Sequence, residues 1–178
     1  ETYQTPAGDW VAPGDVTATE GGYVLKTDTS VPITIGAVEK MSKSKKNVID
    51  PTDIIAKYGA DTARWFMLSD SPPDRDVQWT EAGVEAAHKF IQRLWRLISE
   101  NANTATGYAP GMKLNPPSDG PNFDLYKFTH QSVAQVTADL NRLAFNRVVA
   151  RLYEFSNKIT EMLKYDIRPD ILHQSLTY

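Results

Sequence analysis

The sequence predicts an α+β protein with a β-rich beginning and a helical remainder. Residues 1–39 are rich in Thr, Val, Gly and Pro and contain two β-prone runs, Tyr23–Leu25 and Ile33–Ile35, with a glycine pair before the first run. After residue 50, apolar residues recur at spacings of three and four, which indicates amphipathic helices. We therefore expect a small β-rich unit at 1–39, a loop with short helices at 40–79, and an incomplete helical bundle at 80–178.

The first two helices are expected directly after the basic loop. Pro51 suits a first helical turn, and Gly59 stops the pattern that it begins. Asp61 or Thr62 can then cap a short helix at 63–68.

The longest expected helix starts at Thr80, a candidate N-cap, and runs to about Asn101. One apolar face is expected on it: Val84, Ala87, Ile91, Leu94, Trp95 and Ile98. The Pro- and Gly-rich stretch 102–122 reads as a long connector. Two more helical patterns follow, at 125–140 and 148–163, and the chain ends in a helix-like pattern.

Composition excludes several kinds of function. The net charge is -3, from 19 Lys and Arg against 22 Asp and Glu, so nucleic acid binding would need a local basic patch. Cysteine is absent, which excludes disulfides and thiolate chemistry. The three histidines, His88, His130 and His173, match no metal-ligand spacing, so no metal site is expected. No membrane span or signal peptide is recognisable, which favours a cytoplasmic protein; the missing initial methionine indicates a piece of a longer one.

A lysine-rich loop is the part of the sequence that points to chemistry. Lys40, Lys43, Lys45 and Lys46 alternate with serines and precede a helix. Ammonium groups pair with phosphate oxygens, and hydroxyl and backbone N–H groups add directed hydrogen bonds, so such a loop can hold a polyphosphate. The alternative is an ordinary solvated basic loop.

The exact string favours the first interpretation. Lys40, Met41, Ser42, Lys43 and Ser44 are identical to the KMSKS signature of the class I aminoacyl-tRNA synthetases. The residues that follow, 45–51, continue as sequences of that family do, and 58–64 resemble its helix pair beneath the active site, against the inner side of tRNA.

Within this family the chain resembles the leucyl-tRNA synthetases. The stretch 10–16 is similar to their leucine-specific insertion, and Phe145-Asn146 resembles the start of their anticodon-binding bundle. A further group of residues looks like the leucyl branch: Ser71, Pro72, Pro73, Trp79, Gly83, Val84, Phe90, Arg93 and Trp95.

The resemblance implies ATP-dependent activation of leucine and its transfer to tRNA(Leu), with Mg²⁺ accompanying ATP. It implies that Lys43 stabilises the pyrophosphate, that Lys40 assists, and that residues 40–44 contact ATP. The family's HIGH signature, its nucleotide-binding half and its editing domain are missing, so we expect no activity from these residues alone. Two alternatives stay open: a non-catalytic tRNA-binding or regulatory module, and an isoleucyl or valyl enzyme.

Four residues are candidate tRNA contacts: Arg64, Arg93, His130 and Arg147. Each also has an ordinary explanation as a surface charge, a helix cap partner or, for Arg147, a partner of Asp139 or Glu154. Exposed aromatic rings can stack on RNA bases, but at helical spacing Trp65, Phe66 and Trp95 are expected in the core.

Overall fold

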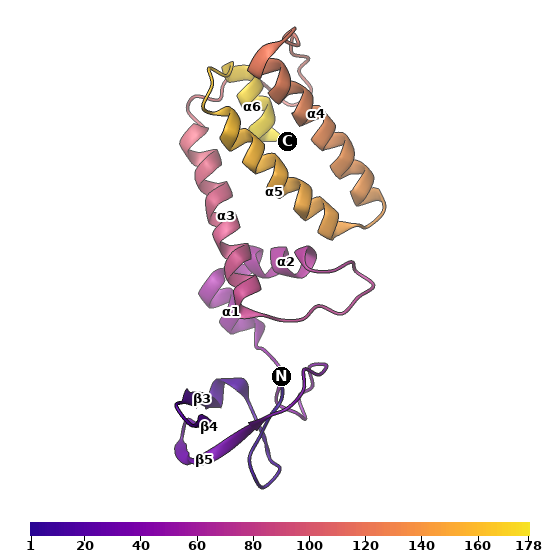
Figure 1. Cartoon of the computed structure of the whole chain (residues 1–178). Helices are drawn as coiled ribbons and strands as arrows, with labels where there is room; N and C mark the ends of the chain where they lie inside the picture. The colour runs from indigo at the N-terminus through magenta and orange to yellow at the C-terminus, as the bar shows by residue number, and fades with distance from the viewer. The chain divides into compact units, whose positions relative to one another are not determined.

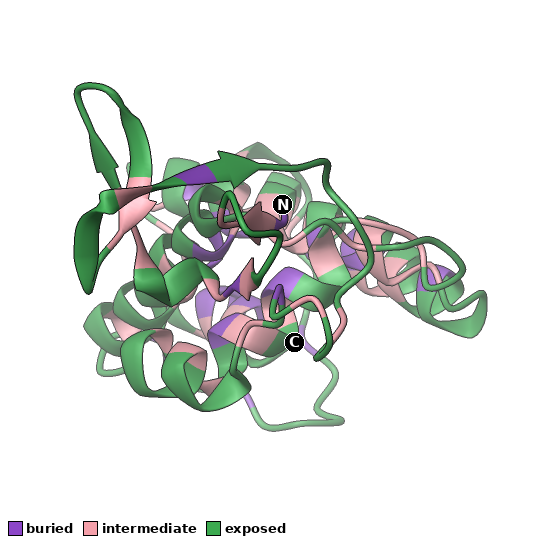
Figure 2. Ribbon diagram, turned by 90° about the horizontal axis from the view of Figure 1, so that it is seen from below, coloured by how far each residue is buried: buried purple, intermediate pink, exposed green.

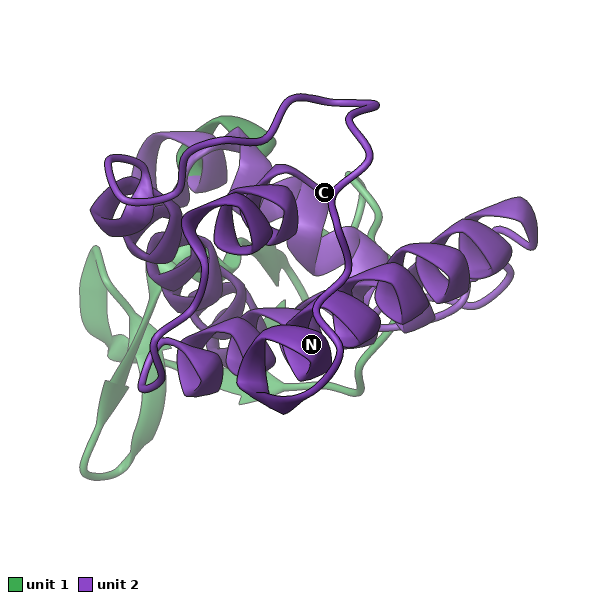
Figure 3. Ribbon diagram, turned by 90° about the horizontal axis from the view of Figure 1, so that it is seen from above, with its two compact units in different colours: residues 1–53 green, residues 54–178 purple.

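The computed structural model describes all 178 residues and divides them into two compact units (Figures 1 and 3). Unit 1 comprises residues 1–53 and contains every strand, whereas unit 2 comprises residues 54–178 and is helical. The division falls within α1, Pro51–Tyr58. The predicted α+β class is confirmed.

Unit 1 is built on a five-stranded antiparallel sheet with the strand order β2-β1-β5-β4-β3. The strands are β1 Tyr3–Gln4, β2 Trp10–Val11, β3 Val16–Thr19, β4 Gly22–Leu25 and β5 Asp28–Ile35. A single turn of 3-10 helix, Pro13–Asp15, precedes β3. The two predicted β-prone runs lie in β4 and β5, as expected, and Gly22 has a φ of 129° where the β3–β4 hairpin turns.

Few side chains of unit 1 are buried, and most of its surface is exposed or half-buried (Figure 2). Its buried apolar residues are Val11 and Ile33, each 7% exposed. Two polar residues are buried with them, Thr2 and Asn47. Hydrogen bonds between strands therefore contribute a large share of what holds this unit together.

Unit 2 takes up the rest of α1 and five further helices. These are α2 Ala60–Ser69, α3 Glu81–Asn101, α4 Gly120–Asn141, α5 Phe145–Met162 and α6 Pro169–Thr177. Each of the helices expected from periodicity is present, and α6 occupies the helix-like pattern near the end of the chain. Figure 1 shows α4 and α5 lying side by side, joined by a short turn.

The contact between α2 and α3 forms a small core from Phe66, Val84 and Ala87. Thr80 caps α3 as predicted, because its Oγ1 accepts a hydrogen bond from the Gly83 N–H at 3.2 Å. Gly83 also lets the two helices approach: a Cβ there would lie 2.6 Å from the Phe66 ring.

The predicted cap of α2 is wrong. Gly59, with a φ of 86°, occupies the N-cap position, and no side chain caps the helix. The Thr62 hydroxyl donates instead to the Tyr58 carbonyl at 2.7 Å, and Asp61 pairs with Arg64 at 2.8 Å. The helix starts before Asp61 and Thr62, so neither residue is in the position that a cap requires.

A larger core joins α3 to α6 and includes part of the connector. Its buried residues are Leu97, Ala105, Tyr108, Leu114, Leu125, Ile159, Met162, Ile171 and Leu172. Three of them lie in the coil between α3 and α4, which ends at residue 119 rather than 122. This coil is therefore packed against the helices along part of its length.

The prediction that Trp95 belongs to the core is wrong, because its side chain is 75% exposed. Val84 and Ala87 are buried against α2 near the start of α3, whereas farther along the helix the buried residues are Phe90 and Leu97, which are seven residues apart and lie nearly above one another. Trp95 precedes Leu97 by two residues, or about 200° around the helix. Ile98 is also exposed, whereas Phe66 is buried and Trp65 half-buried as expected.

Candidate functional site

The signature loop, residues 36–50, is held at both ends by hydrogen bonds within unit 1. Where it leaves β5, the Gly36 N–H donates to the Thr2 carbonyl at 2.8 Å, and a Cβ on residue 36 would collide with the Thr2 hydroxyl. At its far end, Asp50 accepts a hydrogen bond from the Thr52 N–H at 2.8 Å, which lowers the pKa of its carboxyl group. Between these points residues 36–50 form no regular helix or strand.

Within the loop the chain folds back on itself through two successive turns. The N–H of Lys45 donates to the Ser42 carbonyl, and the N–H of Lys46 donates to the Lys43 carbonyl, both at 3.2 Å. Lys46 has a φ of 52°, in the left-handed region, which reverses the chain before Asn47.

Asn47 closes this turn with its side-chain amide. Its Oδ1 accepts a hydrogen bond from the Ser42 N–H at 2.7 Å, and its Nδ2 donates to the Lys40 carbonyl at 3.3 Å. The residue is 6% exposed, although its neighbours in the loop are mostly exposed. Asn47 lies in the stretch 45–51 that resembles the family, but its two hydrogen bonds could not be predicted from the sequence because they depend on how the loop turns.

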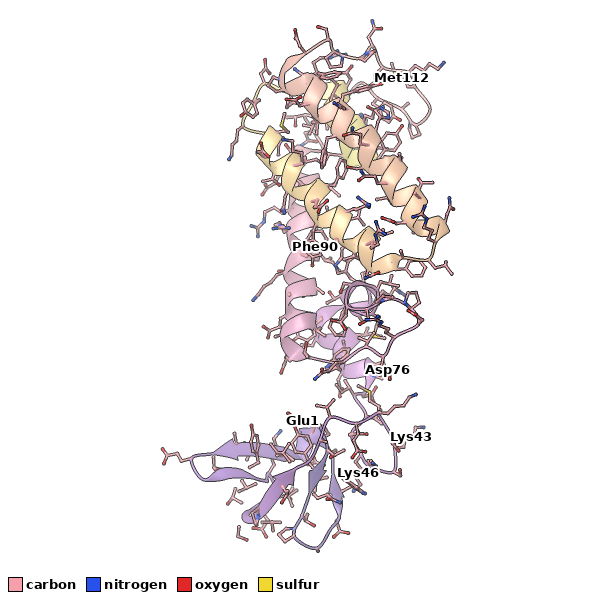
Figure 4. The ribbon with its side chains drawn as sticks, turned by 45° about the vertical axis from the view of Figure 1, so that its right-hand side comes forward. Glu1, Lys43, Lys46, Asp76, Phe90 and Met112 are labelled. Atoms are coloured by element: carbon pink, nitrogen blue, oxygen red, sulfur yellow. The ribbon has the colours of Figure 1, made fainter.

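The four lysines of the loop are not equivalent. Lys45 forms an ion pair with Glu39, and its Nζ lies 5.6 Å from the centroid of the Trp10 ring. Lys40, Lys43 and Lys46 are exposed and have no ion-pair partner in the chain. Figure 4 shows Lys43 and Lys46 on the same loop.

Hydroxyl groups accompany these free ammonium groups. Ser42 Oγ and Ser44 Oγ share a hydrogen bond of 2.8 Å, and Met41 is exposed beside them. Three exposed cations and two hydroxyls have the donors needed to bind a polyanion, and nothing of opposite charge in the chain neutralises those three lysines.

The four candidate tRNA contacts lie in unit 2, each on a different helix. Arg64 on α2 is paired with Asp61. On α3, Arg93 is exposed, and its guanidinium lies 5.3 Å from the centroid of the Phe90 ring without an ion-pair partner. His130 on α4 is exposed beside Tyr126, with the ring centroids 4.5 Å apart.

Arg147, on α5, is itself exposed but pairs with a buried carboxylate. Asp139 has a side chain that is only 3% exposed, and it lies 2.5 Å from Arg151 Nε and 3.4 Å from Arg147 Nε. The Arg151 hydrogen bond and the nearby arginine charges hold the pKa of Asp139 below its usual value. Of the two partners expected for the arginines of this helix, Asp139 is the one that they contact.

No group of three or more His, Asp or Glu side chains gathers where it would hold a metal ion. None of the helices has the length and apolar character that crossing a membrane demands.

Comparison with known proteins finds similarity to one family over this loop. The model of the family described as tRNA synthetases class I (I, L, M and V) matches residues 33–80, which include the whole loop. Leucine–tRNA ligase from Brucella ovis is 52% identical over 167 residues, covering 92% of this chain. The chain matches one segment of the leucine–tRNA ligases. The enzyme from Brucella anthropi gives the same identity and coverage.

The leucine–tRNA ligase match extends over both units, but the chain spans only 18% of the length of these relatives. Among solved structures, the chain is similar to the ternary complex of Agrobacterium radiobacter K84 agnB2 LeuRS, tRNA and LeuAMS. The TM-score is 0.70 and the identity is 25%, with 77% of this chain and 17% of that chain covered. The relatives favour the leucyl interpretation over the isoleucyl and valyl ones.

Proposed function

We propose that these residues supply the phosphate-binding loop and some of the tRNA contacts of an enzyme that activates leucine with ATP and transfers it to tRNA(Leu). The observation that carries the proposal is the exposed signature loop, in which Lys40 and Lys43 have no ion-pair partner. The identity of 52% to leucine–tRNA ligases supports leucine as the amino acid.

In the proposed activation step, a carboxylate oxygen of leucine attacks the α-phosphorus of ATP. The bond from this phosphorus to the bridging oxygen breaks, and pyrophosphate leaves with the electron pair. Negative charge therefore grows on the leaving group, where the ammonium of Lys43 would stabilise it more than it stabilises bound ATP. Lys40 would assist, while Met41, Ser42 and Ser44 complete the ATP contact.

ATP enters this proposal as a substrate, and the class I family supports its use. Mg²⁺ commonly accompanies nucleotide phosphates. This chain contains no group of three or more His, Asp or Glu side chains that could hold the ion. The residues of the loop would contribute binding and charge stabilisation through their own side chains.

In this proposal, three successive segments of the chain have different parts in the longer enzyme. Residues 1–39 would be a leucine-specific type of insertion, 40–79 the loop and the stem-contact region, and 80–178 part of an anticodon-binding bundle. The similar solved structure contains tRNA, which supports tRNA as a partner. No obligate protein partner and no membrane contact enter the proposal.

The role of Lys43 is tested in the longer protein by single-turnover adenylate formation. Lys43→Ala should lower the rate constant by about a hundredfold to a thousandfold, the range for losing one preorganised electrostatic contact. Its effect on the KM for leucine should be smaller.

Lys46→Ala is the matched control, because Lys46 is also exposed, unpaired and in the same loop. It lies outside the signature and should change the rate much less. Equal effects of the two substitutions would contradict the role of Lys43, and no effect of either would favour a non-catalytic tRNA-binding module.

The candidate tRNA contacts can be ranked by whether each arginine already has an ion-pair partner in the chain. Arg93 has no ion-pair partner, whereas Arg64 and Arg147 each face a carboxylate. Arg93→Ala should weaken tRNA binding and lower the dependence of log K on log salt concentration by about one. Arg64→Ala should do less, and a salt slope that Arg93→Ala leaves unchanged would remove Arg93 from the proposed contacts.

A further inference from the structure

Asn47 is the buried polar residue of a mostly exposed loop. Burying an amide costs free energy unless its polar groups are hydrogen-bonded, and both ends of this amide are. Its partners are main-chain groups, so the contact fixes the path of the chain rather than one side chain.

The two bonds reach either side of Met41. Asn47 Oδ1 binds the N–H of Ser42, and Nδ2 binds the carbonyl of Lys40. The amide thus spans the first three residues of the signature, and Lys43 follows directly. The positive φ of Lys46 turns Asn47 back toward them.

We propose that Asn47 is a positioning residue, which holds the backbone of residues 40–42 so that the Lys43 ammonium is directed to one place. This inference rests on the proposed function of the loop. Asn47 itself touches no ligand: its amide is already bonded at both ends and buried. Without it, the Ser42 N–H and the Lys40 carbonyl would bond to water, and the loop would sample more conformations.

This role makes a distinct kinetic prediction. A misplaced catalytic group slows the chemical step, and a shift of about 1 Å can cost about a hundredfold. In the longer protein, Asn47→Ala should lower the single-turnover rate constant of adenylate formation by about tenfold to a hundredfold. The KM for leucine should change by less than about threefold, because leucine does not contact the loop in this proposal.

The decisive measurement is a double-mutant cycle with Lys43→Ala. If Asn47 acts through Lys43, the double variant should be no slower than Lys43→Ala alone, because an absent ammonium cannot be misplaced. Independent, multiplicative losses would overturn the positioning role. If Lys43→Ala is slow but Asn47→Ala has the normal rate, the positioning role alone falls; if Lys43→Ala has the normal rate, the proposed function falls.

A second pair of variants keeps the test valid if Asn47→Ala disturbs folding. Asn47→Asp retains the acceptor for Ser42 but loses the donor to Lys40, so its rate loss should be smaller than that of Asn47→Ala. Val48→Asp is the control for the added charge, since Val48 is exposed and takes no part in the two Asn47 hydrogen bonds. Equal losses in Asn47→Asp and Val48→Asp would assign the effect to charge and overturn the proposal.

Amide hydrogen exchange of the 178-residue chain tests the two Asn47 hydrogen bonds without an activity measurement. The Ser42 N–H should exchange faster in Asn47→Ala, while Ile33 in β5 should keep its wild-type exchange rate. Unchanged exchange at Ser42 would show that the hydrogen bond does not hold the loop in solution, which would also overturn the proposal.

Discussion

The two units differ in how they are held together. Only two of the seventeen buried apolar side chains, Val11 and Ile33, lie in unit 1, and all the others are in unit 2. Unit 1 depends largely on short strands and on polar contacts such as those of Asn47, whereas the helices of unit 2 enclose two apolar clusters. The signature loop therefore belongs to the unit with the smaller apolar core, where local opening costs less free energy.

The largest change in the free energy of unfolding is expected in the core of unit 2. Leu125 on α4 is completely buried, so Leu125→Ala should lower the free energy of unfolding by about 2–5 kcal/mol. Leu140→Ala on the same helix is the control, because Leu140 is 44% exposed and loses little on truncation. Urea denaturation followed by helical circular dichroism measures both, and similar losses would contradict a core centred on Leu125.

A second effect depends on pH and is specific to unit 2. The pKa of Asp139 is lowered in the folded state, mainly by its hydrogen bond from Arg151. Its contribution to stability is therefore present above the unfolded pKa of about 3.9, and is lost as pH falls through the lower folded pKa. Asp139→Asn should make the melting temperature of unit 2 fall less between pH 5 and pH 2.

The control for this substitution is Asp124→Asn, which changes an exposed carboxylate on the same helix. Its melting temperature should follow the wild-type pH dependence. If both variants flatten the curve equally, general charge repulsion and not the Asp139 pair accounts for the acid sensitivity.

The smallest change in stability is expected in the core of unit 1. Ile33→Val removes one methylene from a small core and should cost about 0.5–1.5 kcal/mol. Amide exchange should become faster in β5 and β1 but stay unchanged in α4 and α5. Val38→Ala, which truncates a side chain that is 58% exposed in the same unit, should leave exchange in the sheet as it is.

Sequence reasoning succeeded where a pattern repeats and was less complete where folding depends on distant contacts. The limits of α3, including its Thr80 cap, follow from local signals. Strands β1 and β2 have two residues each, too few to show alternation, and they went unpredicted. On α3 periodicity correctly predicted that Val84 and Ala87 are buried, but it could not show that the buried side changes along the helix, so Trp95 and Ile98 are exposed where burial was expected.

The candidate site divides in the same way. The signature residues 40–44 were found because their identities match a motif, and a motif can be read without a structure. The ion pair of Lys45 with Glu39 and the two hydrogen bonds of the Asn47 side chain were not predicted. Both depend on how the loop turns back on itself, which the order of residues alone does not show.

The exposure of Trp95 has an optical consequence. Trp10, Trp65 and Trp79 are half-buried, so Trp95 is the indole most open to solvent. Its fluorescence should lie to the red of the other three and should be quenched most readily by acrylamide. A molecule that covers this side of α3 would shift the emission to the blue and shield it from the quencher, which gives the helix a built-in reporter of contact.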